Sequence, residues 1–189
     1  RKCRGCRNAS SALPGVPAIP AIPLDFTKPN MLNETPAQLV AHLSHPNGWW
    51  RDNAQRLLVL KQDKSVVPAL TALVRAQDNL TARFHALWTL EGLGALDAGL
   101  VREVMKDPNP RMRIQAIRAS ETLYKAGNKS FDADYRAATK DADVDVVIQA
   151  MMTLKVLRVP DFADVIKTTM AGNKALGVQE LGRMAIVTP

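Results

Sequence analysis

Four segments of the sequence repeat in register, and this repetition limits the possible fold more than any other feature. They align on Ala54, Ala86, Ala116 and Ala150, which lie 32, 30 and 34 residues apart. From the second segment on, apolar residues recur every third position around the alanine, which is the pattern of an amphipathic helix. The small alanine lets a neighbouring helix approach closely. Stacked units of this length predict an α-solenoid.

Each of these helices follows a turn, and a shorter amphipathic segment precedes the turn. The turns, at residues 45–48, 77–79, 107–110 and 141–143, are rich in residues that end one helix and cap the next. Thr35 followed by Pro36 is a strong start signal for the first helix. The shorter helices are expected at 36–44, 66–76, 96–106 and 131–140, and a fifth pair at 161–170 and 178–186. No segment alternates like a strand, so we expect an all-α domain of about four and a half helix pairs over residues 35–189.

Paired polar positions narrow the type of repeat. Asp107 precedes Arg113 by six residues, and the same two positions hold Gln77 with Arg83 and His45 with Arg51. An acid or amide at the turn facing an arginine of the next helix resembles the HEAT-repeat pattern, in which these residues form hydrogen bonds along the stack. We therefore interpret one set of residues as a structural ladder: Arg51, Arg83, Asp107 and Arg113.

The first 34 residues form a separate region. Cys3 and Cys6 form a C-x-x-C pair, but the position where a haem attachment motif needs histidine holds Arg7. We favour an unstructured terminus for this stretch, with a redox role or a disulfide of the two cysteines as the alternative. Prolines recur every third residue from Pro14 to Pro23, which favours an extended polyproline II segment.

The Pro-rich segment has an apolar edge, because Val16, Ile19 and Ile22 share the same period of three. It could be a ligand for an aromatic-lined groove of the SH3 type. The alternative is a stiff linker laid against the adjoining domain. We favour the linker, because no cation flanks the prolines between Arg7 and Lys28.

The positive charge is uneven. The formal net charge is +7, but residues 1–7 alone contribute +4. Residues 109–129 carry +4, whereas residues 130–164 carry −3. A continuous track for nucleic acid phosphates would not run into such an acidic stretch. A nucleic-acid-binding HEAT-like protein of the DNA glycosylase kind is therefore the alternative rather than the leading hypothesis.

The sequence offers no catalytic or cofactor-binding constellation. We find no phosphate loop, no histidine or cysteine set with metal-ligand spacing, and no paired carboxylates in a plausible pocket. Asp141, Asp143 and Asp145 alternate as a calcium loop begins, but the required glycine is missing, so we assign them to helix capping. A third possibility is a HEAT-like bilin lyase or hydroxylase, but the sequence contains neither the metal ligands nor the nucleophile that such an enzyme needs. No apolar run approaches the about 20 residues that cross a bilayer.

Two neighbouring columns of the second helices are the best candidate for a partner-binding strip on the concave side. A column here is the set of residues at one aligned position of the repeats. The position just before each aligned alanine holds polar residues. The position two residues after the alanine holds arginines, a tryptophan and a methionine, and tryptophan and arginine are favoured at interfaces. Trp88 has an equally weighted alternative role as a core residue, and His85 suits a hydrogen-bonding strut better than a metal ligand. The strip comprises Asn53, Arg56, His85, Trp88, Gln115, Arg118, Gln149 and Met152.

Three segments carry a more specific resemblance: residues 43–58 with the Trp49–Trp50 pair, 84–96 and 107–114. Together they look like the HEAT-repeat region of bacterial putative membrane-bound dehydrogenases of the quinoprotein sugar type. In that family a β-propeller precedes the repeats and a cytochrome c domain commonly follows them. The resemblance covers roughly residues 28–183 and does not extend to the Cys and Pro stretch.

The resemblance implies a spacer and docking surface between redox partners. Neither the propeller nor the haem motif is present, so no catalytic residue is carried over and we expect the chain itself not to be an enzyme. Its expected partner is another protein or neighbouring domains of the same polypeptide, with no cofactor. The family implies a periplasmic or exported location, although no signal peptide is visible in this chain. The start at Arg1 rather than Met is expected of a piece of a longer protein or of a processed product.

Overall fold

The computed structural model describes residues 29–187, and every regular element in this range is helical. The all-α prediction is thus confirmed for these residues. Three short 3₁₀ turns are η1 (Met31–Asn33), η2 (Lys64–Val66) and η3 (Lys129–Phe131). The α-helices are α1 (Pro36–His42), α2 (Gly48–Lys61), α3 (Val67–Arg75), α4 (Leu80–Gly92), α5 (Ala98–Val104), α6 (Pro110–Lys125), α7 (Asp132–Ala138), α8 (Val144–Val156), α9 (Phe162–Gly172) and α10 (Leu176–Val187).

The helix boundaries follow the cap residues. Thr35 accepts a hydrogen bond from Gln38 N–H, and Pro36 occupies the first helical position of α1. Asn47, Asn79, Asn109 and Asp143 cap α2, α4, α6 and α8 through their side-chain oxygens. Because these signals are local, both ends of each shorter helix and of α10 lie within two residues of the expected ranges.

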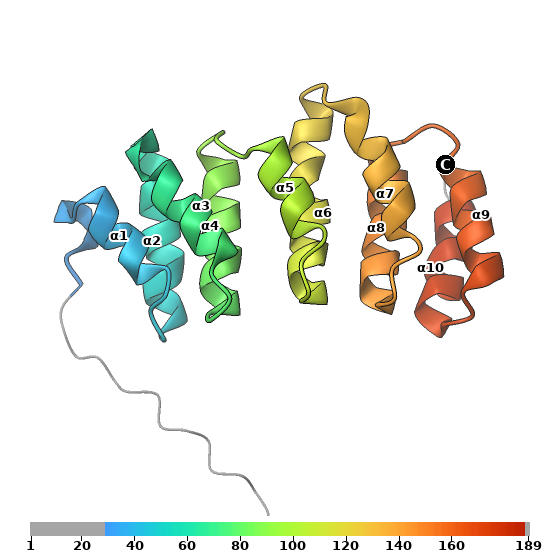
Figure 1. Ribbon diagram of the computed structural model, residues 1–189, viewed down its shortest axis with the longest axis horizontal. Coiled ribbons are helices and arrows are strands. Elements are labelled where there is room, and N and C mark those ends of the chain that lie inside the picture. Colours follow the sequence, from blue (N-terminus) through green and yellow to red (C-terminus); the bar gives the residue numbers. More distant parts are fainter. Residues whose placement is uncertain (1–28, 188–189) are drawn as a thin grey trace, which may run out of the picture.

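The helices form a row of pairs that runs from α1–α2 to α9–α10 (Figure 1). Each odd-numbered helix packs against the even-numbered helix of its own pair, and α2, α4, α6, α8 and α10 also pack successively against one another. Contacts between successive odd-numbered helices are few within the described residues. The even-numbered helices therefore form the closely packed side of the row, which we call the second-helix face.

The core runs along this row. The four aligned alanines Ala54, Ala86, Ala116 and Ala150 are each 0% exposed, as expected where helices approach closely. Close approach also explains Gly92, since a Cβ there would lie 2.6 Å from a Val59 methyl group of α2. A smaller apolar cluster joins the last helices, α8 to α10.

The helical body begins before the expected boundary at residue 35. Met31 of η1 is buried in the main core, and η1 packs against α2. In the same region Trp50 is buried and stacks on His45, with 5.1 Å between ring centroids, which closes the first pair. Its neighbour Trp49 is 51% exposed. The predictions for Cys3, Cys6 and the Pro-rich segment fall on residues 1–28, outside the described residues.

Candidate functional site

A buried ion pair lies at the centre of the polar ladder. Arg83 of α4 is 2% exposed, and its guanidinium binds the carboxylate of Asp107 in the turn before α6. The same guanidinium donates to the carbonyl of Val74 at 2.7 Å and to Gln77 Oε1 at 3.3 Å. This one side chain therefore joins its own pair of helices to the next pair.

The next helix pair repeats this contact between an arginine and the carboxylate of the following turn. Arg113 of α6 donates to both carboxylate oxygens of Asp141, at 2.9 and 2.7 Å, and to the carbonyl of Asp107 at 2.9 Å. Burial of Asp141 opposes its ionisation, but the hydrogen bonds from Arg113 and from Asp143 N–H outweigh burial and lower the pKa of this carboxyl. Each ladder carboxylate also accepts from the backbone two residues on, Asp107 from Asn109 and Asp141 from Asp143, at 2.8 Å in both cases. A carboxylate at this position thus fixes a turn and binds the preceding pair.

The ladder arginine of the first helix pair, Arg51, contacts a histidine of the next pair instead of a carboxylate. Arg51 donates to the carbonyls of His45 and Pro46, and its Nε lies 3.3 Å from His85 Nε2. His85 Nδ1 lies 2.7 Å from Gln55 Oε1. The arginine N–H and the amide oxygen together require a neutral imidazole with its proton on Nδ1. Burial, followed by the charge of Arg51, lowers the pKa of His85 below its ordinary value of 6.5, although Asp52 opposes this shift.

The lowered pKa of His85 predicts a loss of stability on mild acidification. The unfolded chain takes up a proton at His85 near pH 6.5, whereas the folded chain does so only at lower pH, so stability is full above that value and decreases as pH falls below it. His85→Gln should reduce the fall in melting temperature between about pH 7.5 and pH 5. Thermal unfolding followed by circular dichroism measures this slope, and His42 and His45 are unchanged in both proteins. An unaltered slope would contradict the assignment.

In the middle of the predicted strip, the indole of Trp88 contacts two other strip residues, Gln115 and Arg118. Trp88 is half-buried, packs against the main core and donates its Nε1–H to Gln115 Oε1 at 2.9 Å. The guanidinium carbon of Arg118 lies 5.9 Å from its ring centroid, within the range of cation–π attraction. Trp88 therefore joins α4 to α6, while Arg118 beside it is exposed.

The two ends of the strip lie in different surroundings. On α8, Gln149 donates to Thr153 at 3.1 Å, and Met152 is 44% exposed. On α2, Asn53 and Arg56 line a groove at the N-terminal end of the row. The strip residues from Trp88 to Met152 thus lie on three successively packed helices, α4, α6 and α8, whereas Asn53 and Arg56 border a separate surface.

Two hydroxyl–carboxylate contacts between second helices were not predicted. Thr122 of α6 donates to Glu91 of α4 at 2.7 Å, and Thr153 of α8 donates to Glu121 of α6 at 2.6 Å. Both pairs are some thirty residues apart in sequence, so helical spacing within one segment does not reveal them. These contacts join neighbouring second helices beyond the ladder.

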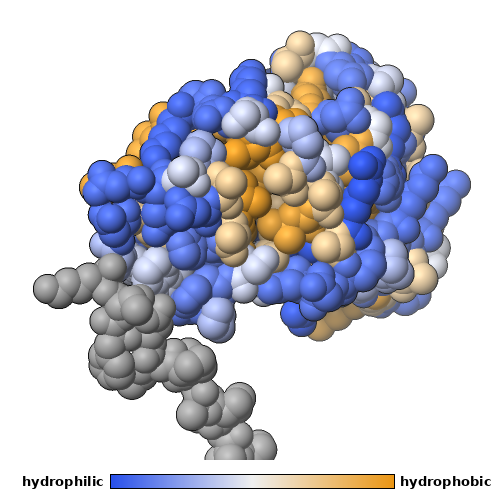
Figure 2. Space-filling model, turned by 60° about the vertical axis from the view of Figure 1, so that its left-hand side comes forward, coloured by the Kyte–Doolittle hydropathy of each residue, from blue (hydrophilic) through white to orange (hydrophobic). Residues whose placement is uncertain are grey.

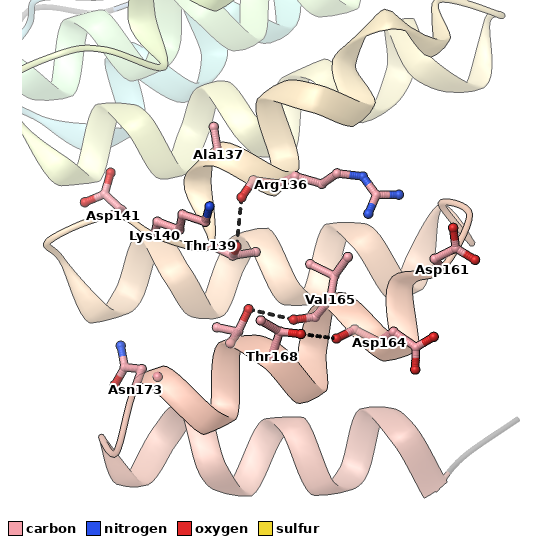
Figure 3. Close-up of a pocket in the computed structure, with 12 residues that line it drawn as sticks. Arg136, Ala137, Thr139, Lys140, Asp141, Asp161, Asp164, Val165, Thr168 and Asn173 are labelled. Carbon is pink, nitrogen blue, oxygen red and sulfur yellow. Dashed lines mark hydrogen bonds between the residues drawn. The ribbon is translucent and has the colours of Figure 1, made fainter.

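A groove with a volume of about 940 Å³ lies between α7 and α9. Lys140 and Asp141 lie at one end of it and Asp161 and Asp164 at the other (Figure 3). The hydroxyls of Thr139, Thr168 and Thr169 donate to carbonyls of their own helices, so they are engaged locally. These residues do not form an arrangement of nucleophile, base and orienting group.

The described residues contain no group of three or more histidine, cysteine, aspartate or glutamate side chains that could hold a metal ion. No helix among residues 29–187 combines the length and apolarity needed to cross a bilayer. Compared with known proteins, the chain matches no protein-family model and no curated protein sequence.

Proposed function

We propose that this chain is a non-catalytic HEAT-like α-solenoid module that binds a protein partner through its second-helix face. The observation that carries the proposal is the unbroken packing of α2, α4, α6, α8 and α10, which presents one side of every repeat on a common surface. The few contacts between odd-numbered helices favour a row that curves toward the second helices. A concave surface of this kind suits extended contacts with another protein.

The ladder supports the HEAT-like assignment. Arginines at equivalent positions of α4 and α6 bind the turn carboxylate of the following pair, Arg83 with Asp107 and Arg113 with Asp141. A repeated inter-pair bond of this kind fixes the angle between units and leaves the second-helix face available for binding.

The proposed contact region is the strip from Trp88 to Met152. Arg118 and Met152 are exposed there, and Trp88 and Gln115 are half-buried beside them. Arginine and tryptophan are enriched among residues that dominate binding energy, and methionine adapts to varied surfaces. These side chains fit a partner with an apolar contact and an acidic group for Arg118.

We further propose that the partner is another part of a larger exported dehydrogenase, whose catalytic and electron-transfer domains this module would link. This rests on the resemblance of residues 43–58, 84–96 and 107–114 to that family. On the same resemblance we propose a location in the periplasm or outside the cell. The isolated chain should then show no turnover with a sugar and a quinone cofactor, and measured turnover would overturn the non-enzyme proposal.

Site-directed photo-crosslinking and affinity measurement test the binding surface. A benzophenone side chain at position 152, in the cell of origin, should crosslink a protein that the same group at position 106, in the turn after α5, does not. Binding to that purified protein should weaken about tenfold or more in Arg118→Glu and stay unchanged in Lys106→Glu. Equal crosslinking at both positions, or equal loss in both variants, would contradict the proposal.

Nucleic acid binding is the less favoured alternative, because many cations are already paired. Six arginines of the described residues form ion pairs with aspartate or glutamate: Arg75, Arg83, Arg102, Arg113, Arg136 and Arg183. A phosphate-binding surface needs cations that face the ligand together. Salt-sensitive DNA binding that persists after Arg1, Lys2, Arg4 and Arg7 are changed to glutamine would favour this alternative.

A further inference from the structure

The N-terminal end of the row carries an apolar groove, separate from the proposed binding strip. Its volume is about 550 Å³, and it lies between residues 29–33 and the outer side of α2. Three large side chains lining it are exposed, Leu32 at 76%, Trp49 at 51% and Leu60 at 66%. A view turned toward this end shows apolar surface gathered within a border of hydrophilic residues (Figure 2).

The groove lies on the side of α2 that later repeats use for packing. In later repeats, His85, Thr122 and Thr153 each contact the second helix of the preceding pair. The equivalent positions of the first repeat hold Asn53, Leu60 and Leu57, which line the groove. This face of α2 therefore has the form of a packing surface for which the described residues supply no preceding helix pair.

The segment just before Pro29 has the composition of a cover for this face. Pro29 and Asn30 themselves line the groove, so the chain reaches it without an intervening linker. Residues 14–23 carry proline every third position, which excludes a helix pair there and favours an extended form. Val16, Ile19 and Ile22 then share one edge.

We propose that this Pro-rich segment docks in the end groove of its own chain, with the edge of Val16, Ile19 and Ile22 against Trp49, Leu57 and Leu60. An aromatic side chain beside apolar residues is a common surface for polyproline II segments. Asp25, the one acid between Arg7 and Lys28, can meet the exposed Arg56 at the rim of the groove. Because the tether raises the effective concentration to about the millimolar range, weak contacts are enough to hold the segment. This inference does not depend on the proposed function.

A matched pair of charge substitutions in the full chain tests the docking. Ile19→Asp with Ile22→Asp places two charges on the apolar edge, and Ala18→Asp with Ala21→Asp places the same charges on a different edge. Chymotrypsin cleavage after Phe26 should accelerate about tenfold or more in the isoleucine variant relative to the alanine variant. The indole N–H signal of Trp49, assigned with Trp49→Phe, should shift in the isoleucine variant only, and that of Trp88 should stay in place.

The groove is tested from its own side by Leu60→Asp. Because Leu60 is 66% exposed, this change should leave the helical circular dichroism spectrum unaltered. Leu60→Asp should accelerate cleavage after Phe26 to the same extent as the isoleucine variant. Combining Leu60→Asp with Ile19→Asp and Ile22→Asp should add no further acceleration. Equal cleavage of the two charge variants would overturn the proposal. So would a molecular mass that doubles with concentration and returns to that of one chain in Leu60→Asp, since a second copy would then cover the face.

Discussion

Replacing Asp107 with asparagine should lower the free energy of unfolding by about 3 kcal/mol, because the change leaves the buried charge of Arg83 without its counter-ion. The side chains of this pair are 3% and 5% exposed, so water cannot substitute for the lost carboxylate. Asparagine keeps an oxygen for Asn109 N–H, which confines the change to the ion pair. Urea unfolding followed by circular dichroism measures the loss.

The matched control is Asp78→Ala, in the corresponding turn one pair earlier. Asp78 is exposed, so its removal should change the free energy by less than about 0.5 kcal/mol. In the double variant Arg83→Met, Asp107→Asn, the loss should be smaller than the sum of the two single losses, because no buried charge remains unpaired. Additive losses would show that the two side chains act independently.

The helical elements could be predicted because their signals are short-range. Caps such as Thr35, Asn79 and Asn109 bind backbone groups within three residues, so they act the same way in any tertiary context. Met31 escaped prediction because η1 has no periodic pattern, and only its packing against α2 makes it part of the body.

The ladder shows where sequence reasoning is limited. Spacing within one repeat associated Arg113 with Asp107, and the structure does join them, but through the Asp107 carbonyl. The carboxylate that Arg113 binds belongs to Asp141, 28 residues later. The sequence pattern favours helix capping for Asp141 rather than a place in the ladder, because its own repeat holds Val147 where the earlier repeats have the arginine. A contact between repeats depends on how units stack, which one repeat does not encode.

The candidate site was only partly predictable for a similar reason. The columns correctly gathered Trp88, Gln115 and Arg118 on adjoining helices. They did not show that no helix pair precedes the first repeat among the described residues. Because that neighbour is missing there, Asn53 and Arg56 line an end groove. The aligned position of a residue in its repeat gives the direction in which its side chain points, but the neighbouring helix pair determines which groups that side chain contacts.

Phe131→Ala should destabilise the chain by about 3–5 kcal/mol, because the phenyl ring is fully buried and touches three kinds of neighbour. It joins the main core, stacks on Tyr135 with 6.2 Å between centroids, and lies 4.5 Å from the guanidinium carbon of Arg102. Arg102 itself stays anchored by Asp134 and Ser130, so truncation leaves a cavity rather than a collapsed site.

The position of Phe131 in the row makes the effect directional. The ring lies between the α5–α6 and α7–α8 pairs, and α1 to α4 do not need α7 to pack against one another. Hydrogen exchange in Phe131→Ala should therefore accelerate most in α7 and α8, while α2 and α4 keep much of their protection. Phe131→Leu fills most of the space and should cost less than about 1.5 kcal/mol. Uniform acceleration from α1 to α10 would instead indicate that the described helices unfold as one cooperative unit, against the pairwise packing on which the proposed function depends.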